Sequence, residues 1–237
     1  MKLLHFEQKP ILDQLLLEEA LLRANQDNWA LINEGSSKAI VMGISSKAEE
    51  WVSPFAFQDQ IPVIRRFSGG GTVIVDENTL FVTFIFNAST LPFPPYPEPI
   101  LRFTEGIYQP VFNHKAFQIQ GTDYAMNDRK CGGNAQYIRK GRWLHHTTFL
   151  WDYDPCNMEY LLHPKKMPSY RNNRPHADFV CRLKDYFPSK KTFIHRLKSH
   201  LSATFGAVES QIPFFQGEYR RTTHLYDKTE LSSHQET

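Results

Sequence analysis

The sequence predicts an α+β fold, a mixed α/β arrangement in which a central mixed β-sheet is flanked by helices. Short β-rich runs and amphipathic runs are intermixed along the 237 residues. Several β-rich runs follow one another across turn residues, which argues against a strict series of strand–helix–strand units. No Gly/Ser linker or charge run divides the chain, so a single domain over residues 1–237 is the better expectation.

The N-terminal third is expected to supply one helix and then two strands. Pro10 suits the first turn of a helix over residues 10–23, whose leucines and Ile11 follow a helical period. Residues 29–33 and 39–42 are rich in strand-forming side chains. Further strands are expected over residues 61–67, 72–75, 80–86, 117–119, 124–127, 135–139 and 143–151, and further helices over residues 100–112, 157–162 and 191–205.

Turns and prolines separate these elements. The turn-forming residues 76–79 lie between two β-rich runs and predict a hairpin. Residues 91–99 hold five prolines, which predicts a covering loop or a stiff spacer because proline removes a backbone donor. Residues 226–237 are polar and are expected to form a frayed tail.

Composition and charge exclude several classes of protein. Lysine and arginine number 27 against 25 acidic residues, so the formal charge of +2 does not suggest a nucleic-acid binder. No apolar stretch approaches membrane-spanning length, and charges come too early for a signal peptide. Three cysteines without a CxxC pair fit a reducing compartment. We therefore expect a soluble cytoplasmic protein, and an organellar location also fits.

The run from Arg65 to Gly71, Arg-Arg-Phe-Ser-Gly-Gly-Gly, is the most informative stretch. Three glycines between β-rich runs indicate unusual dihedrals or a close approach of the backbone to a ligand. Arg66, Ser68 and the glycine amides suit a phosphate or carboxylate. The alternative is a glycine-rich turn beside a solvated arginine pair. A strand follows the glycines, which fits neither a Walker loop nor a dinucleotide fingerprint.

A second group of polar residues spans residues 128–136 and 145–148. Lys130 precedes two glycines and is either a solvated turn lysine or a point charge for phosphate. His145 and His146 are adjacent on an expected strand, so at most one of them faces a given pocket. No His/Cys spacing in the sequence is typical of a metal site.

Together these segments resemble the lipoate-protein ligase A family, within the biotin/lipoate ligase fold. The family pattern appears in order as Arg65 to Gly71, then Asp76, then residues 128–135 around Lys130, then residues 145–148. Residues 14–20, Gln-Leu-Leu-Leu-Glu-Glu-Ala, echo the opening helix of the family. The resemblance covers roughly residues 1–190.

The resemblance implies a chemistry and a set of partners. Family members activate lipoate or octanoate with ATP and Mg²⁺ as an acyl-adenylate. They then transfer the acyl group to a lysine of a lipoyl carrier domain, from a 2-oxoacid dehydrogenase complex or the glycine cleavage H protein. The implied catalytic residue is Lys130, and the implied substrate-binding residues are Arg66, Ser68, Gly69, Gly70, Gly71, Asp76, Asp123, Asn134, Ala135 and His146.

Two departures leave alternatives open. Val75 precedes Asp76 where many family members have histidine, and the chain is too short for the C-terminal accessory domain of the bacterial ligase, so a separate accessory protein is one expectation. A carrier-to-carrier acyltransferase with a thioester at Cys131 is a second reading, because Lys130 beside it would favour a thiolate. A non-catalytic carrier-binding homologue is a third. Val73 and Val75 are expected to wall an acyl tunnel or to be plain core.

Overall fold

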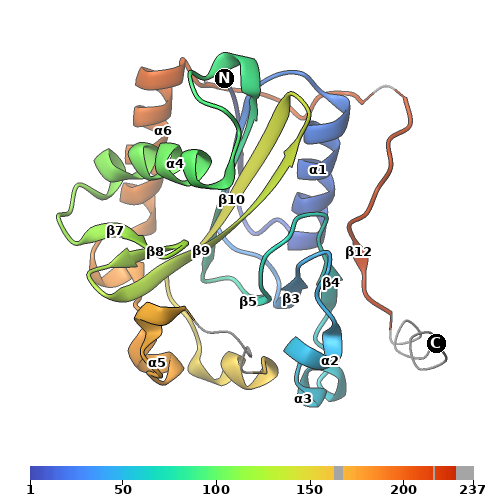
Figure 1. Ribbon diagram of the computed structural model, residues 1–237, viewed down its shortest axis with the longest axis vertical. Helices are drawn as coiled ribbons and strands as arrows, with labels where there is room; N and C mark the ends of the chain where they lie inside the picture. Colours follow the sequence, from blue (N-terminus) through green and yellow to red (C-terminus); the bar gives the residue numbers. More distant parts are fainter. Residues whose placement is uncertain (163–167, 216, 228–237) are drawn as a thin grey trace.

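The computed structural model of the chain (Figure 1) describes residues 1–162, 168–215 and 217–227. Within these residues, strands form a large sheet in the order β11-β1-β2-β6-β10-β9-β8-β7 and a small sheet in the order β12-β4-β3-β5. β1 pairs in parallel with β2 and β11, and β3 pairs in parallel with β4, whereas the other pairs are antiparallel. The expected mixed sheet flanked by helices is therefore confirmed.

The bounds of the elements are as follows. The large sheet contains β1 (Lys2–Phe6), β2 (Trp29–Asn33), β6 (Thr79–Asn87), β7 (Phe117–Gln120), β8 (Asp123–Met126), β9 (Arg129–Arg139), β10 (Arg142–Leu150) and β11 (Val208–Glu209). The small sheet contains β3 (Ala39–Met42), β4 (Val63–Arg65), β5 (Val73–Val75) and β12 (His224–Leu225). The helices are α1 (Ile11–Ala24), α2 (Ala48–Trp51), α3 (Pro54–Gln58), α4 (Pro97–Phe112), α5 (His176–Phe179) and α6 (Lys190–Phe205).

The large sheet is covered on both faces. In β2, Ala30 and Ile32 belong to the core under α4 and α6, whereas Trp29 and Leu31 pack in the core beneath α1. This period of two follows from the alternation of side chains along a strand. Figure 1 shows α4 and α6 together on one side of the sheet and α1 on the other. The face beneath α1 carries the candidate functional site.

Most expected elements are present, with shifted ends. The helix expected from residue 100 begins at Pro97, because proline is well suited to the first helical turn, where no backbone donor is needed. The strand expected over residues 135–139 begins at Arg129, since β9 pairs with β8 as well as with β10. The helix expected over residues 157–162 is a 3₁₀ helix, Pro155–Tyr160.

The hairpin expected around residues 76–79 is wrong in its pairing. β5 pairs with β3 in the small sheet, while β6 pairs with β2 and β10 in the large sheet. The turn itself is built as expected: the Asp76 carboxylate accepts hydrogen bonds from the Asn78 amide at 2.9 Å and from the Thr79 hydroxyl at 3.3 Å. The turn therefore carries the chain from one sheet to the other.

The tail expected from Tyr226 is also corrected at its start. The Tyr226 amide donates to the Val63 carbonyl at 2.7 Å, which extends the pairing of β12 with β4. Residues 228–237 lie outside the described part of the chain.

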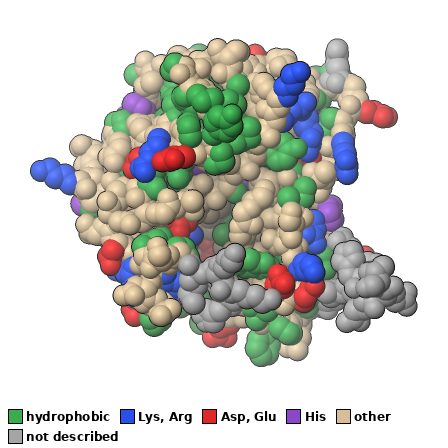
Figure 2. Space-filling model, viewed as in Figure 1, with side chains coloured by type: hydrophobic (Ala, Val, Ile, Leu, Met, Phe, Trp, Pro, Cys, Tyr) green, Lys and Arg blue, Asp and Glu red, His purple; other side chains and the backbone are tan. Residues whose placement is uncertain are grey.

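In Figure 2, lysine and arginine side chains gather toward the edge of the molecule where α1 and the C-terminal segment run. Among the helices that the structure describes, none is both long enough and apolar enough to cross a membrane.

Candidate functional site

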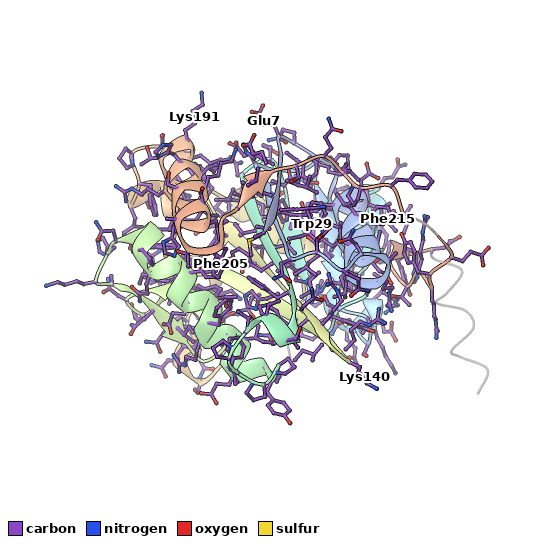
Figure 3. The ribbon with its side chains drawn as sticks, turned by 90° about the horizontal axis from the view of Figure 1, so that it is seen from above. Glu7, Trp29, Lys140, Lys191, Phe205 and Phe215 are labelled. Atoms are coloured by element: carbon purple, nitrogen blue, oxygen red, sulfur yellow. The ribbon has the colours of Figure 1, made fainter. Side chains whose placement is uncertain are left out.

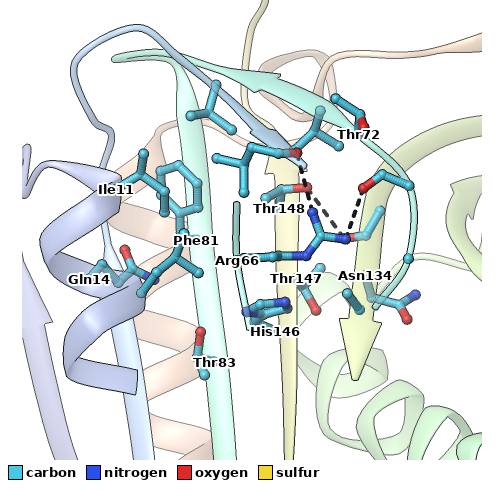
Figure 4. A pocket seen from close by; sticks show the side chains of 18 of the residues that line it. Ile11, Gln14, Arg66, Thr72, Phe81, Thr83, Asn134, His146, Thr147 and Thr148 are labelled. Carbon is cyan, nitrogen blue, oxygen red and sulfur yellow. Dashed lines mark hydrogen bonds between the residues drawn. The ribbon is translucent and has the colours of Figure 1, made fainter. Parts of the chain in front are cut away.

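A cavity of about 240 Å³ lies between α1, the small sheet and strands β8 to β10. Figure 4 shows Ile11, Gln14 and Phe81 on one side of Arg66 and Asn134 on the other. The residues that line the cavity are Ile11, Gln14, Leu15, Glu18, Val41, Arg66, Gly70, Gly71, Thr72, Val73, Val75, Phe81, Thr83, Thr122, Asp123, Lys130, Gly133, Asn134, Ala135, His146, Thr147 and Thr148.

One wall of the cavity is apolar. It is formed by one hydrophobic cluster that combines residues of α1, β3, β5 and β6, namely Ile11, Leu15, Val41, Val73, Val75 and Phe81. Val73 and Val75 both line the cavity, Val75 as a member of the cluster and Val73 packed against it. That these two residues wall an acyl tunnel stays a prediction. Such a wall suits a hydrocarbon chain, because burying apolar surface is favourable by roughly 25 cal/mol per Å².

The opposite wall carries a lysine that is paired with an acid. The Lys130 ammonium lies 2.8 Å from one carboxylate oxygen of Asp123, and the other oxygen accepts a hydrogen bond from the Tyr170 hydroxyl at 2.8 Å. The Lys130 side chain is 26% exposed and lies on a strand, so it is not a solvated turn lysine. An ammonium has three donors. Within the described residues, the Asp123 carboxylate is the one charged partner of Lys130, which leaves donors for a ligand.

Arg66 lies beneath the glycine loop and is buried. Its guanidinium donates to the Gly69 carbonyl at 2.6 Å, the Gly71 carbonyl at 2.9 Å and the Ser68 hydroxyl at 3.0 Å. Burial lowers the pKa of Arg66 to about 10, an effect that the nearby Glu18 charge opposes, so the side chain stays cationic at neutral pH. Most of its donors therefore shape the loop and are not free for phosphate.

A chain of hydrogen bonds ties the loop to α1. The Ser68 hydroxyl lies 2.9 Å from His146 Nε2, and His146 Nδ1 lies 2.9 Å from the Glu18 carboxylate. Glu18 also accepts from the Gln14 amide at 2.8 Å and from the Thr83 hydroxyl at 2.6 Å. The sequence predicted this helix from its apolar period and assigned no site role to Gln14 or Glu18. The signal for a second role is the presence of two polar residues, Gln14 and Glu18, four positions apart and next to the apolar stripe.

The two adjacent histidines face opposite sides of the sheet, as their position on a strand predicts. His146 lines the cavity, whereas His145 is fully buried on the other face with its Nε2 3.0 Å from the Tyr124 hydroxyl. Burial lowers the pKa of His145 to about 3, an effect that His146 reinforces, so His145 is neutral in the core. His145 is therefore not a candidate ligand of the cavity.

Of the residues expected at the site, the cavity is lined by Arg66, Gly70, Gly71, Asp123, Lys130, Asn134, Ala135 and His146. Ser68 and Gly69 are not among the lining residues, although both contact Arg66. Asp76 is not a lining residue either, and its second carboxylate oxygen accepts from the Asn157 amide at 3.0 Å. Tyr170 is a functional candidate that sequence reasoning missed, since nothing local marks a tyrosine 47 positions from Asp123 as its partner.

Cys131 does not have the environment of a reactive thiol. Its side chain is fully buried in the core with the aromatic residues under α4 and α6. Burial raises the pKa of the Cys131 thiol well above its usual range, and the opposing effect of Lys130 is smaller. The expectation that Lys130 favours a thiolate at Cys131 is wrong, because desolvation of the charged form outweighs the neighbouring cation.

No group of three or more His, Cys, Asp or Glu side chains is placed to hold a metal ion within the part of the chain that the structure describes.

The family model of the lipoyl protein ligase A/B catalytic domain matches residues 10–206. The chain belongs to this family. A lipoate-protein ligase A bound with ATP has the same fold, with a TM-score of 0.70 and 19% sequence identity over 89% of this chain and 87% of that one. A bipartite lipoate protein ligase of Thermoplasma acidophilum, studied with its E2 lipoyl domain, gives a TM-score of 0.71 and 18% identity over 89% and 85%.

One sequence relative is named as an inactive ligase. Plasmodium falciparum inactive lipoate-protein ligase 2 is 26% identical over 261 aligned positions, covering 81% of this chain and 66% of that protein. The chain spans less than two thirds of the length of the curated relatives that it matches.

Proposed function

We propose that this chain binds the acyl-adenylate of lipoate or octanoate and transfers the acyl group to a lysine of a lipoyl carrier domain. The observation that carries the proposal is a cavity with an apolar wall, which includes Leu15 and Phe81, opposite a polar wall that holds Lys130 and Asp123. An acyl-adenylate has the same division into a hydrocarbon chain and a charged phosphoester. The ATP-bound relative with the same fold supports the nucleotide half of the proposal.

In the activation step, the carboxylate of the acid attacks the α-phosphorus of ATP and pyrophosphate leaves. Magnesium enters as the companion of the ATP phosphates, as is usual for nucleotide substrates. Lys130 stabilises the negative charge that develops on the phosphate oxygens. Asp123 holds the Lys130 ammonium in place, and the Tyr170 hydroxyl donates to the other oxygen of Asp123. The family resemblance also implies that Asp123 recognises adenine. Its carboxylate is positioned by contacts with Lys130 and Tyr170.

In the transfer step, the carrier lysine amine attacks the acyl carbon, a nitrogen–carbon bond forms, and AMP leaves with the electrons of the broken carbon–oxygen bond. The amine loses its proton to the departing phosphate or to solvent. No cysteine takes part, which agrees with the burial of Cys131. The carrier in this proposal is the lipoyl domain of a 2-oxoacid dehydrogenase complex or the glycine cleavage H protein.

The decisive experiment separates activation from transfer. Purified protein is incubated with ATP, Mg²⁺ and lipoate or octanoate, and acyl-AMP and pyrophosphate are measured. A second reaction supplies preformed lipoyl-AMP with a lipoyl domain, and modification of the domain is followed by mass spectrometry. Products in both reactions support a complete ligase. Transfer without activation assigns only the second step to the chain, and the absence of both products together with no binding of lipoyl-AMP refutes the proposal.

A further inference from the structure

The segment Thr222–Tyr226 lies beyond the stretch that matches the family model, which ends at residue 206. It nevertheless returns to the functional site. His224 and Leu225 form β12 and pair antiparallel with Arg65 and Ile64 of β4, the strand that leads directly into the glycine loop. Figure 1 shows this segment running past α1 to β4.

The segment is anchored before it reaches β4. Phe215 packs against the hydrophobic cluster that contains Leu17, Leu21 and Trp29. Figure 3 shows Phe215 and Trp29 on the side of the molecule where α1 lies. The chain that leads to Thr222 is therefore held beside α1, against the core that this helix covers.

Glu19 of α1 binds the segment through its carboxylate, which is fully buried. It accepts from the Thr222 amide at 3.0 Å, the Thr222 hydroxyl at 2.8 Å and the Thr223 amide at 3.0 Å. Burial would raise the pKa of Glu19, but the hydrogen bonds from Thr223 and Thr222 outweigh burial and lower it. A buried carboxylate with several donors is a strong attachment point, since charge-assisted hydrogen bonds are about twice as strong as neutral ones.

Thr223 connects Glu19 to the loop through hydrogen bonds. Its hydroxyl oxygen accepts a hydrogen bond from the Phe67 amide at 3.2 Å, and both residues are buried. Phe67 stands between Arg66 and Ser68, the two side chains that shape the glycine loop from below. The Phe67 amide is thus held by a residue 156 positions away in the sequence.

Adjacent glutamates of α1 therefore reach the loop from different directions. Successive helical residues point about 100° apart. Glu18 holds His146, which contacts Ser68, and Glu19 holds Thr223, which accepts from Phe67. A loop with three glycines has a large conformational entropy when free, so such ties decide whether it is ordered before a ligand arrives.

We propose that the segment Thr222–Tyr226 is a positioning element of the site, through which Glu19 and Thr223 fix the loop Arg66–Gly71 in its ligand-binding form. The ligand in this statement rests on the proposed function. That the segment holds the loop rests on the hydrogen bonds alone. The order of the loop and its affinity for the ligand are therefore tested separately.

The first test measures hydrogen exchange of the backbone amides of Phe67 to Gly71 in full-length variants. Thr223→Val keeps the shape and the backbone amide but removes the oxygen that accepts from Phe67. We expect exchange at Phe67 to become about five- to tenfold faster, because a buried donor loses its partner. Thr223→Ser retains the hydroxyl and is expected to keep the wild-type rate. Glu19→Gln should accelerate exchange at the same amides.

A matched control comes from the same end of the chain. Glu209 pairs with Lys198 at 2.7 Å, and β11 lies at the edge of the large sheet, beside β1. Glu209→Gln should leave exchange in the loop unchanged. Wild-type exchange at Phe67 to Gly71 in both Thr223→Val and Glu19→Gln overturns the proposal. If Glu19→Gln does not fold, the comparison of Thr223→Val with Thr223→Ser still decides whether the segment holds the loop.

The second test measures the affinity for a non-hydrolysable lipoyl-adenylate analogue by calorimetry. Thr223→Val and Glu19→Gln should bind about tenfold more weakly, and Thr223→Ser and Glu209→Gln should bind as the wild type does. Faster loop exchange with wild-type affinity overturns the positioning role. If the wild-type protein does not bind the analogue, the proposed function fails instead, and the exchange rates still decide whether the segment holds the loop.

Discussion

Gly70 has a backbone conformation that other residues rarely adopt. Its φ is +96°, and a Cβ there would lie 2.9 Å from the Arg66 guanidinium. Gly70→Ala should therefore lower the free energy of unfolding by about 1–3 kcal/mol and displace Arg66. Chemical denaturation measures this loss. Gly69→Ala is the control, because a Cβ at Gly69 meets nothing within 4 Å, and equal losses in the two variants would contradict the explanation.

The glycine loop is not uniform in this respect. The sequence predicted unusual dihedrals or a close approach of the backbone for the three glycines alike. A Cβ at Gly71, like one at Gly69, meets nothing within 4 Å. Gly43 has a stronger steric requirement, since a Cβ there would lie within van der Waals overlap of the Gly70 carbonyl. Gly43 and Gly70 thus bring two parts of the backbone close together, and a close approach of Gly70 and Gly71 to a ligand stays a prediction.

Lys130 is expected to act on charge that develops during acyl activation. Lys130→Ala removes one preorganised donor, and such losses cost about 10²- to 10³-fold in rate. The rate of acyl-AMP formation measures the effect. Lys140→Ala, at an exposed lysine in the turn between β9 and β10, should keep the wild-type rate. An unchanged rate in Lys130→Ala with an intact thermal transition would remove Lys130 from the mechanism.

Cys131 is expected to be chemically inert in the folded protein. Cys156 is exposed and Cys131 is buried, with its pKa raised by burial. Iodoacetamide at neutral pH should therefore label Cys156 first and Cys131 only after unfolding, as mapped by mass spectrometry. Cys131→Ala should keep acyl transfer. A thioester trapped on Cys131 of the native protein would instead favour the transferase reading.

At the scale of elements, α1 joins the small sheet, the large sheet and the C-terminal segment. Its Ile11 and Leu15 belong to the apolar wall, Glu18 binds His146, and Glu19 binds Thr222. The helix that was predicted from its apolar period therefore also carries polar contacts in two directions. The sequence reading identified the helix from its period, but the period does not say which partners its polar residues meet.

The attachment of Thr222 and Thr223 to Glu19, which also pairs with Arg23 at 2.8 Å, should depend on pH. The pKa of Glu19 is lowered in the folded protein, so its stabilising effect is complete above its unfolded-state pKa and is lost as the pH falls through the folded-state value. The difference in unfolding free energy between wild type and Glu19→Gln should be largest near pH 7 and should shrink below about pH 4. A difference that is constant from pH 7 to pH 3 would contradict this assignment.

At the scale of the whole molecule, the cavity is shared by α1 and both sheets, so a ligand should stabilise them together. At a concentration of 100 times its dissociation constant, a lipoyl-adenylate analogue should add about 2.7 kcal/mol to the free energy of unfolding. For a chain of this size, the thermal midpoint should rise by roughly 5–10 °C. Octanoate at the same molar concentration as the analogue fills only the apolar part and binds more weakly, so it should give a smaller rise. Equal shifts for the two ligands would contradict the division of the cavity into two walls.

The sequence by itself determined the local features. The hydrophobic runs predicted β2 and β3 with their observed bounds, and the alternation of a strand placed His146 and His145 on opposite faces. The order of motifs predicted the family, which the match over residues 10–206 confirms. These features depend on neighbours within a few residues, where backbone geometry and side-chain period act directly.

Only the tertiary structure decided which distant residues meet. β5 pairs with β3 and not with β6, Tyr170 reaches Asp123, and Thr223 holds Phe67. The last two contacts span 47 and 156 positions of the chain. Such contacts depend on how distant segments pack against the two sheets, which local propensity does not encode. The site is therefore completed by residues that carry no motif of their own.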